Sequence, residues 1–138
     1  MGDKYGAIAD YTKAVDLKPE YALAYNRMGL CKMLLGDLKG AIADFTKAIN
    51  IDGGFADAYY DRGLAKYGTK DYYGAISDLT NALKFSSSLN NALVGESYYL
   101  RGSAKYYLGD NSGSCLDLKK AQQLGFNQGA EIMNFVCK

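Results

Sequence analysis

The three cysteines of the sequence, Cys31, Cys115 and Cys137, are its candidates for nucleophilic, redox or metal chemistry. None belongs to a C-x-x-C pair, and the sequence contains no histidine, the residue that most often completes a zinc site or activates a nucleophilic thiol. Two interpretations of Cys115 and Cys137 stay open: buried thiols, or a disulfide between neighbouring helices. Cys31 would be unpaired in both, which favours a reducing compartment. We therefore expect no metal, no cofactor, no catalytic residue and no enzymatic activity.

The charges of the sequence are balanced. Its 138 residues include 16 Lys and Arg against 15 Asp and Glu, for a net charge of +1. No basic stripe suits a nucleic acid, and no apolar run approaches the roughly 18 residues that a membrane span needs. We expect neither nucleic-acid binding nor membrane insertion. A cytoplasmic location is favoured, with periplasmic or secreted locations left open.

One segment of the sequence recurs along the chain. Residues 2–15 match residues 36–49 at ten positions. The same frame continues at the same spacing at 71–83, and more weakly at 110–121, where a five-residue insertion within 86–95 lengthens the spacing. A second kind of segment, with tyrosine and glycine, alternates with the first at 24–29, 58–63 and 97–102. Two alternating units in a period of about 34 residues predict a solenoid of helical hairpins.

The spacing of small and aromatic residues in both segments resembles the tetratricopeptide repeat family over nearly the whole chain. One segment carries an aromatic residue four positions before a glycine, and the other carries small, large and small residues at four- and three-residue steps. The first pattern is met by Tyr25 and Gly29, Tyr59 and Gly63, and Tyr98 and Gly102; the second by Ala7, Tyr11 and Ala14, Ala41, Phe45 and Ala48, Ala75, Leu79 and Ala82, and Ser114, Leu118 and Ala121. The Tyr-Tyr-x-Arg-Gly and Gly-Ala-Ile-x-Asp segments are similar to those of bacterial members.

The resemblance implies an all-α protein, a right-handed α-solenoid of antiparallel helix hairpins in a single domain over 1–138. It would comprise a leading half repeat (2–19), three repeats (20–53, 54–89 and 90–125) and a C-terminal capping helix (126–138). Hydrophobic periodicity and turn residues predict eight helices, at 4–17, 20–35, 38–50, 55–68, 71–84, 91–108, 112–124 and 128–136. The last should cover the apolar side of the final repeat with residues such as Ile132, Met133 and Phe135.

Some positions depart from the family pattern. Lys70 replaces the glycine of the turn within the repeat at 54–89, and we expect Gly68 to end the preceding helix early. Arg62 and Arg101 replace an apolar residue, and a half-buried charge needs a partner. We expect structural ion pairs between these arginines and the carboxylates that recur at one position of the second helix, Asp44, Asp78 and Asp117.

Residue 2 aligns with a turn glycine, so the first helix of the chain has no hairpin partner. Either the chain is a fragment of a longer array or another molecule covers this helix. An alternative function follows, in which the chain is a structural module that assembles with itself as a homo-oligomer through the uncovered N-terminal helix.

The resemblance also implies that the first helix of each hairpin lines a concave groove, where a protein or peptide partner of unknown identity binds. Three- and four-residue spacing places a tyrosine-rich set with several carboxylates there. The candidate groove residues are Asn26, Arg27, Leu30, Asp57, Tyr60, Asp61, Leu64, Tyr67, Glu96, Tyr99, Ser103 and Tyr106. Such a surface suits an extended peptide or a partner helix with a basic residue, although the tyrosines could instead fill gaps between repeats.

Chaperone-binding members of the family hold a C-terminal carboxylate with Lys, Asn and Arg side chains. In this sequence Asp57, Tyr60 and Asp61 stand in that part of the groove, and Asn26 and Arg27 could supply only part of such a clamp. We therefore expect a non-catalytic interaction scaffold that does not bind chaperone tails.

Overall fold

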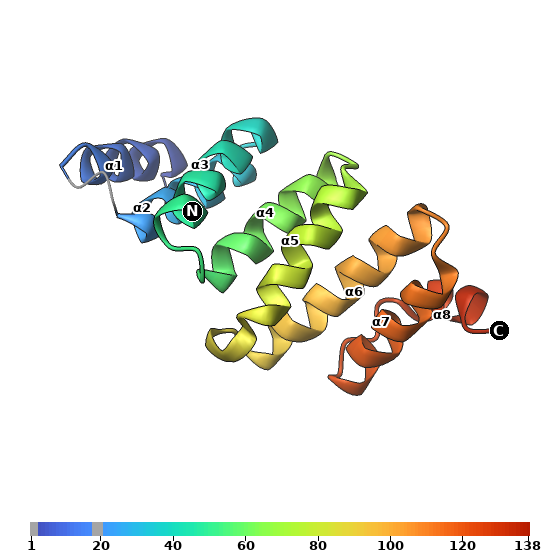
Figure 1. Ribbon diagram of the computed structural model, residues 1–138. Helices are drawn as coiled ribbons and strands as arrows, with labels where there is room; N and C mark the ends of the chain where they lie inside the picture. Colours follow the sequence, from blue (N-terminus) through green and yellow to red (C-terminus); the bar gives the residue numbers. More distant parts are fainter. Residues whose placement is uncertain (1–2, 18–20) are drawn as a thin grey trace.

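The computed structural model describes residues 3–17 and 21–138, and every regular element in these ranges is helical. The helices follow one another as antiparallel neighbours (Figure 1). They are α1 (Lys4–Leu17), α2 (Ala22–Leu34), α3 (Leu38–Ile51), α4 (Ala56–Gly68), α5 (Tyr72–Lys84), α6 (Asn91–Tyr107), α7 (Asn111–Gln123) and α8 (Ala130–Val136), with a 3-10 turn at Ser86–Ser88. The eight predicted helices are confirmed to within two residues at each end; the predicted start at residue 20 lies outside the described residues.

The second helix of each hairpin begins at an aspartate. The side chains of Asp37, Asp71 and Asp110 each accept a hydrogen bond from the backbone N–H three residues later, at 2.8–3.0 Å. Asn90 caps α6 in the same way. These caps satisfy N–H groups that a helix leaves unpaired in its first turn, so the start of each of these helices is determined locally.

The turns inside the hairpins share one geometry. Gly36 and Gly109, each two residues after a helix ends, have φ of 85° and 83°. Lys70 occupies the same place with φ of 63°, a left-handed conformation that favours glycine. α4 ends at Gly68, as predicted, but this end is not early, because it lies at the same position relative to the turn as the ends of α2 and α6 do.

Small residues let the two helices of a hairpin pack closely. Ala41, Ala75 and Ala82 are fully buried, as are the large side chains of Phe45 and Leu79 between the helices. At Gly29 an added Cβ would lie 2.6 Å from the ring of Phe45, so only glycine fits there. The predicted role of the repeated Gly and Ala positions in close packing is confirmed.

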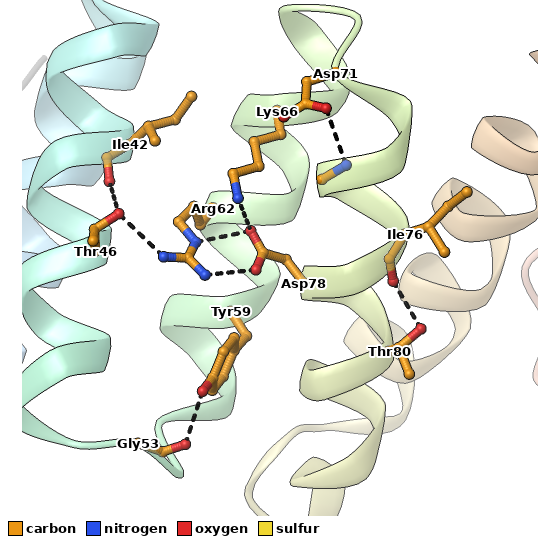
Figure 2. Close-up of polar contacts among 11 residues, drawn as sticks. Ile42, Thr46, Gly53, Tyr59, Arg62, Lys66, Asp71, Ile76, Asp78 and Thr80 are labelled. Atoms are coloured by element: carbon orange, nitrogen blue, oxygen red, sulfur yellow. Dashed lines mark hydrogen bonds and ion pairs between the residues drawn. The ribbon is translucent and has the colours of Figure 1, made fainter.

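Arginine and lysine side chains form ion pairs within the hairpins, and arginine also links a hairpin to the preceding one. Arg62 of α4 donates two hydrogen bonds to the carboxylate of Asp78 on α5, and a third to Thr46 of the preceding hairpin (Figure 2). Lys66, one turn later, contacts the same carboxylate at 3.1 Å. Arg101, Lys105 and Asp117 repeat the arrangement. These ion pairs confirm the prediction for both arginines.

The repeat at 20–53 differs, because Met28 stands where the others have arginine. Lys32 alone pairs with Asp44, at 2.8 Å. The lysine four residues after each of these positions was not predicted, although its recurrence at Lys32, Lys66 and Lys105 is visible in the sequence. These clusters lie between helices and hold the stack together.

A disulfide joins Cys115 of α7 to Cys137, directly after α8, with their Cα atoms 5.1 Å apart. Of the two interpretations left open by the sequence, the disulfide is the one that the structure has, while Cys31 is a free thiol. In the capping helix α8, Val136 is buried. Phe135 does not bury itself as expected: it is 60% exposed, with its ring edge-on to Tyr106 of α6.

Candidate functional site

The first helices of the hairpins, α2, α4 and α6, contact one another in succession along one side of the stack. A hollow of about 200 Å³ opens between them. It is lined by Leu23, Asn26, Arg27, Leu30, Asp57, Tyr60, Asp61 and Leu93. The structure thus brings together six of the predicted groove residues: Asn26, Arg27, Leu30, Asp57, Tyr60 and Asp61.

Sequence reasoning missed Leu93 as a lining residue of the hollow. Leu93 lies in the first turn of α6, which has 17 residues where α2 and α4 have 13. The added residues come from the insertion near residue 90, so they have no counterpart in the other repeats. Because a helix was predicted from residue 91, the three-residue step from Leu93 to the predicted groove residue Glu96 is the signal that could have found it.

Buried polar groups form the floor of the hollow. The side-chain amide of Asn26, which is 3% exposed, donates to Asp61 Oδ2 at 3.2 Å. Burial raises the pKa of Asp61 to about 7, and the neighbouring charge of Asp57 acts in the same direction. The hydrogen bond from Asn26 and the charge of Arg27 oppose this rise in pKa without cancelling it.

Tyr60 is the aromatic wall of the hollow, and it is only 6% exposed. Burial raises its pKa, and its hydrogen bond to Glu96 adds to the rise, because the phenol is the donor. Tyr60 therefore ties α4 to α6 and fills a gap between repeats, as the alternative interpretation of the tyrosines supposed. Arg27 and Asp57 are exposed at the edge.

The other predicted residues lie along α4 and α6, outside the hollow. Tyr67 is half-buried in an aromatic cluster with Tyr72 and Tyr107, and burial raises its pKa to about 12. Tyr106 has its ring centre 5.5 Å from that of Tyr107, and Tyr99 packs on Phe126. Tyr67, Tyr72, Tyr106 and Tyr107 therefore form one aromatic cluster at the C-terminal ends of α4 and α6, and Tyr99 belongs to a separate ring contact.

Two of the predicted groove residues pack against neighbouring helices, one fully and one in part. Ser103 is fully buried, so the prediction that it faces a partner is wrong. Its neighbours Gly102 and Ala104 are buried as well, so this part of α6 is packed against the neighbouring helices. Leu64 is half-buried and packs against the hydrophobic core between α4, α5 and α6.

Metal-binding clusters and membrane-spanning helices are both absent from residues 3–17 and 21–138. No three Cys, Asp or Glu side chains there are grouped so that they could hold a metal ion. None of the helices in these ranges has the length and apolarity that crossing a membrane requires.

Comparison with known proteins agrees with this architecture. A family model described as "TPR repeat" matches residues 32–70. A crystal structure of MamA superposes with a TM-score of 0.87 at 25% identity, over 98% of this chain and 77% of that one. For YrrB the TM-score is 0.79 at 23% identity, over 91% of this chain and 63% of that one. The TPR2B domain of yeast Sti1 gives 0.70 at 29% identity, over 76% of this chain and 85% of that one.

A search of curated proteins finds no match. The family model covers about one period of the repeat, from the end of α2 to the loop after α4. The same helical order and the same aspartate caps extend from α1 to α7 on both sides of it. Residues 32–70 thus match the tetratricopeptide repeat family, and the whole chain has the helical-hairpin fold of the similar structures.

Proposed function

We propose that the chain is a non-catalytic scaffold that binds an extended peptide or a helix of a partner protein along α2, α4 and α6. The observation that carries the proposal is the hollow between these helices, together with the aromatic cluster of Tyr67, Tyr106 and Tyr107 on α4 and α6. Tyrosine offers a large contact area and a polar tip at a small entropic cost, so such surfaces suit protein partners.

Two of the similar structures support a peptide as the partner. YrrB is described as a tetratricopeptide repeat protein with an unusual peptide-binding site, and the Sti1 domain was solved in a complex denoted pHsp70. A clamp for a C-terminal carboxylate is disfavoured here, since Asp57 and Asp61 would repel that group. An internal peptide segment is the more suitable ligand.

A random peptide library displayed on phage and selected on the full chain tests the proposal. The groove variant exchanges the charges of two exposed residues, Arg27→Glu with Asp57→Lys, and leaves the net charge unchanged. The control variant makes the same exchange on α7 and α8, Lys119→Glu with Glu131→Lys, whose side chains are also exposed. Calorimetry of the selected peptides should show about tenfold weaker binding to the groove variant and unchanged binding to the control.

Selected peptides that bind both variants equally would remove the groove as the binding surface. Sedimentation of the free chain examines the alternative function, self-assembly. Two large apolar side chains of α1, those of Tyr5 and Leu17, are 74% and 89% exposed. Association that is abolished by Tyr5→Ser with Leu17→Ser, combined with no groove-dependent peptide, would favour the assembly role.

A further inference from the structure

The hollow contains a buried hydrogen-bond acceptor that the protein itself does not use. Asn26 is 3% exposed, and its side-chain nitrogen donates to Asp61. Its Oδ1 atom has no hydrogen-bond partner among the described residues. Leaving a buried acceptor unpaired is unfavourable, and this one belongs to the lining of an open hollow. A donor that enters the hollow would remove this cost.

One carboxyl group contacts the Asn26 side chain, and two others lie nearby. Asp61, 8% exposed, holds the other end of the Asn26 amide, and Asp57 lies one helical turn before it on the same face of α4. Glu96 of α6 accepts the hydrogen bond of Tyr60 close by. Arg27 is the cation in the lining, and both it and Asp57 are exposed at the edge. The buried polar groups of the lining, Asn26 Oδ1 and the Asp61 carboxyl group, therefore present acceptors, and Asp57 adds negative charge at the edge.

The remaining walls are apolar. Leu23 and Leu30 come from α2, and Leu93 comes from the first turn of α6, on the opposite side. A ligand that fits both parts needs a hydrocarbon stem against the leucines and a cationic donor at its tip. Lysine has this combination, since its four methylene groups pack on apolar surface while its ammonium carries three donors.

We propose that the hollow between α2, α4 and α6 binds a lysine side chain of the partner segment, whose ammonium donates to Asn26 Oδ1 and is neutralised by Asp57 and Asp61. The inference rests on the proposed function, because the lysine belongs to a peptide held in the groove. It adds the chemistry that would select that peptide. An ammonium group between these carboxylates forms charge-assisted hydrogen bonds, which are stronger than neutral ones.

A small probe tests the inference without any peptide partner. Nα-acetyl-lysine methylamide, which keeps the side-chain ammonium, is titrated into the isotope-labelled full chain. NMR follows the side-chain amide of Asn26 and the methyl groups of Leu23, Leu30 and Leu93. The norleucine compound is the matched probe, since it keeps the hydrocarbon stem and lacks the ammonium. We expect saturable shifts of these resonances with the lysine compound, and about tenfold weaker binding of the norleucine compound.

Two variants locate the charge requirement. Asp57→Asn changes an exposed residue and should leave the fold intact, and Asp61→Asn is nearly isosteric and keeps a hydrogen-bonding group beside Asn26. Each should weaken binding of the lysine compound about tenfold, because each removes one charged partner of the ammonium. Glu131→Gln on α8 removes a carboxylate far from the hollow and should change nothing.

Equal binding of the two compounds, or no shift at Asn26 with either one, would overturn the inference. The proposed function would survive that result under two conditions. The selected peptides would still bind the groove variant more weakly than the native chain, and their affinity would be unchanged when every lysine is replaced by norleucine. Conversely, peptides insensitive to the groove variant would remove the proposed function, even where the lysine compound binds. The proposed function and the binding of a lysine side chain are thus contradicted by different measurements.

Discussion

The guanidinium of Arg62 forms two parallel hydrogen bonds with the carboxylate of Asp78, from Nε to Oδ2 at 2.8 Å and from Nη2 to Oδ1 at 2.7 Å. Its remaining nitrogen donates to Thr46 of the preceding hairpin at 3.1 Å. One side chain thereby connects three helices, α3, α4 and α5 (Figure 2). The bidentate geometry is specific to arginine, and lysine cannot reproduce it.

Replacing Arg62 by methionine, the residue found at position 28 of the repeat at 20–53, should destabilise the chain. Asp78 is nearly buried and would keep only Lys66, so we expect a loss of about 3 kcal/mol in the free energy of unfolding. Urea denaturation at neutral pH measures this loss. Arg27→Met, at an exposed position, should cost less than about 0.5 kcal/mol. Equal losses in the two variants would show that the Arg62 ion pair contributes no specific stability.

Lys70 offers a stabilising substitution. Its φ of 63° is a conformation that costs a residue with a Cβ about 1–2 kcal/mol relative to glycine. We expect Lys70→Gly to raise the melting temperature, with a gain of about 1 kcal/mol in the free energy of unfolding. Lys70→Ala removes the same charged side chain and keeps the strain, so it should give no gain. Identical melting temperatures for the two variants would attribute any change to the lost charge.

The sequence was sufficient to predict the helices, because their determinants are local and repeat. Aspartate caps begin the second helices, and small residues at fixed steps mark the packing face. The error at Gly68 arose from weighting glycine as a helix breaker. The backbone hydrogen bonds of the turn, from Lys70 to Tyr67 and from Asp71 to Lys66, match those of the turn at Gly36, and they hold Lys70 in place against its preference.

The spacing in the sequence predicted on which side of the stack the groove residues lie, but not how deeply each of them is buried. Three- and four-residue spacing correctly placed Asn26 and Asp57 on the same side of the stack. Whether a side chain on that side is exposed depends on the neighbouring helices, and Ser103 and Tyr60 proved to be buried for that reason. The disulfide also depended on tertiary structure, since spacing alone does not give the distance between α7 and the end of α8.

The disulfide should contribute to stability through the capping helix. Its cysteines are 22 residues apart, and closing a loop of this length stabilises a fold by about 3 kcal/mol in the chain-entropy model. Cys115→Ser with Cys137→Ser should lower the free energy of unfolding by this amount and speed amide hydrogen exchange in α8. Cys31→Ser, which removes the free thiol, is the control. Unchanged exchange in α8 of the double variant would mean that packing alone holds this helix.

The protonation of Asp61 reflects groups on two helices. Asp57 precedes it by one turn on α4, and Asn26 and Arg27 act on it from α2. Burial is the largest influence and raises its pKa to about 7 from the ordinary 3.8. The hydrogen bond from Asn26 and the charge of Arg27 only moderate the rise.

The folded chain therefore holds one more proton at Asp61 than the unfolded chain between pH 4 and pH 7, and stability from this group falls as the pH rises through that window. Asp61→Asn removes the titration and supplies an amide that can donate to Asn26. We expect its free energy of unfolding to exceed that of the native chain by roughly 3 kcal/mol more at pH 8 than at pH 4. The free energy of unfolding of Glu131→Gln should change with pH as that of the native chain does. If the free energy of unfolding of Asp61→Asn also follows the native pH dependence, Asp61 titrates normally and its carboxylate is solvated through the hollow.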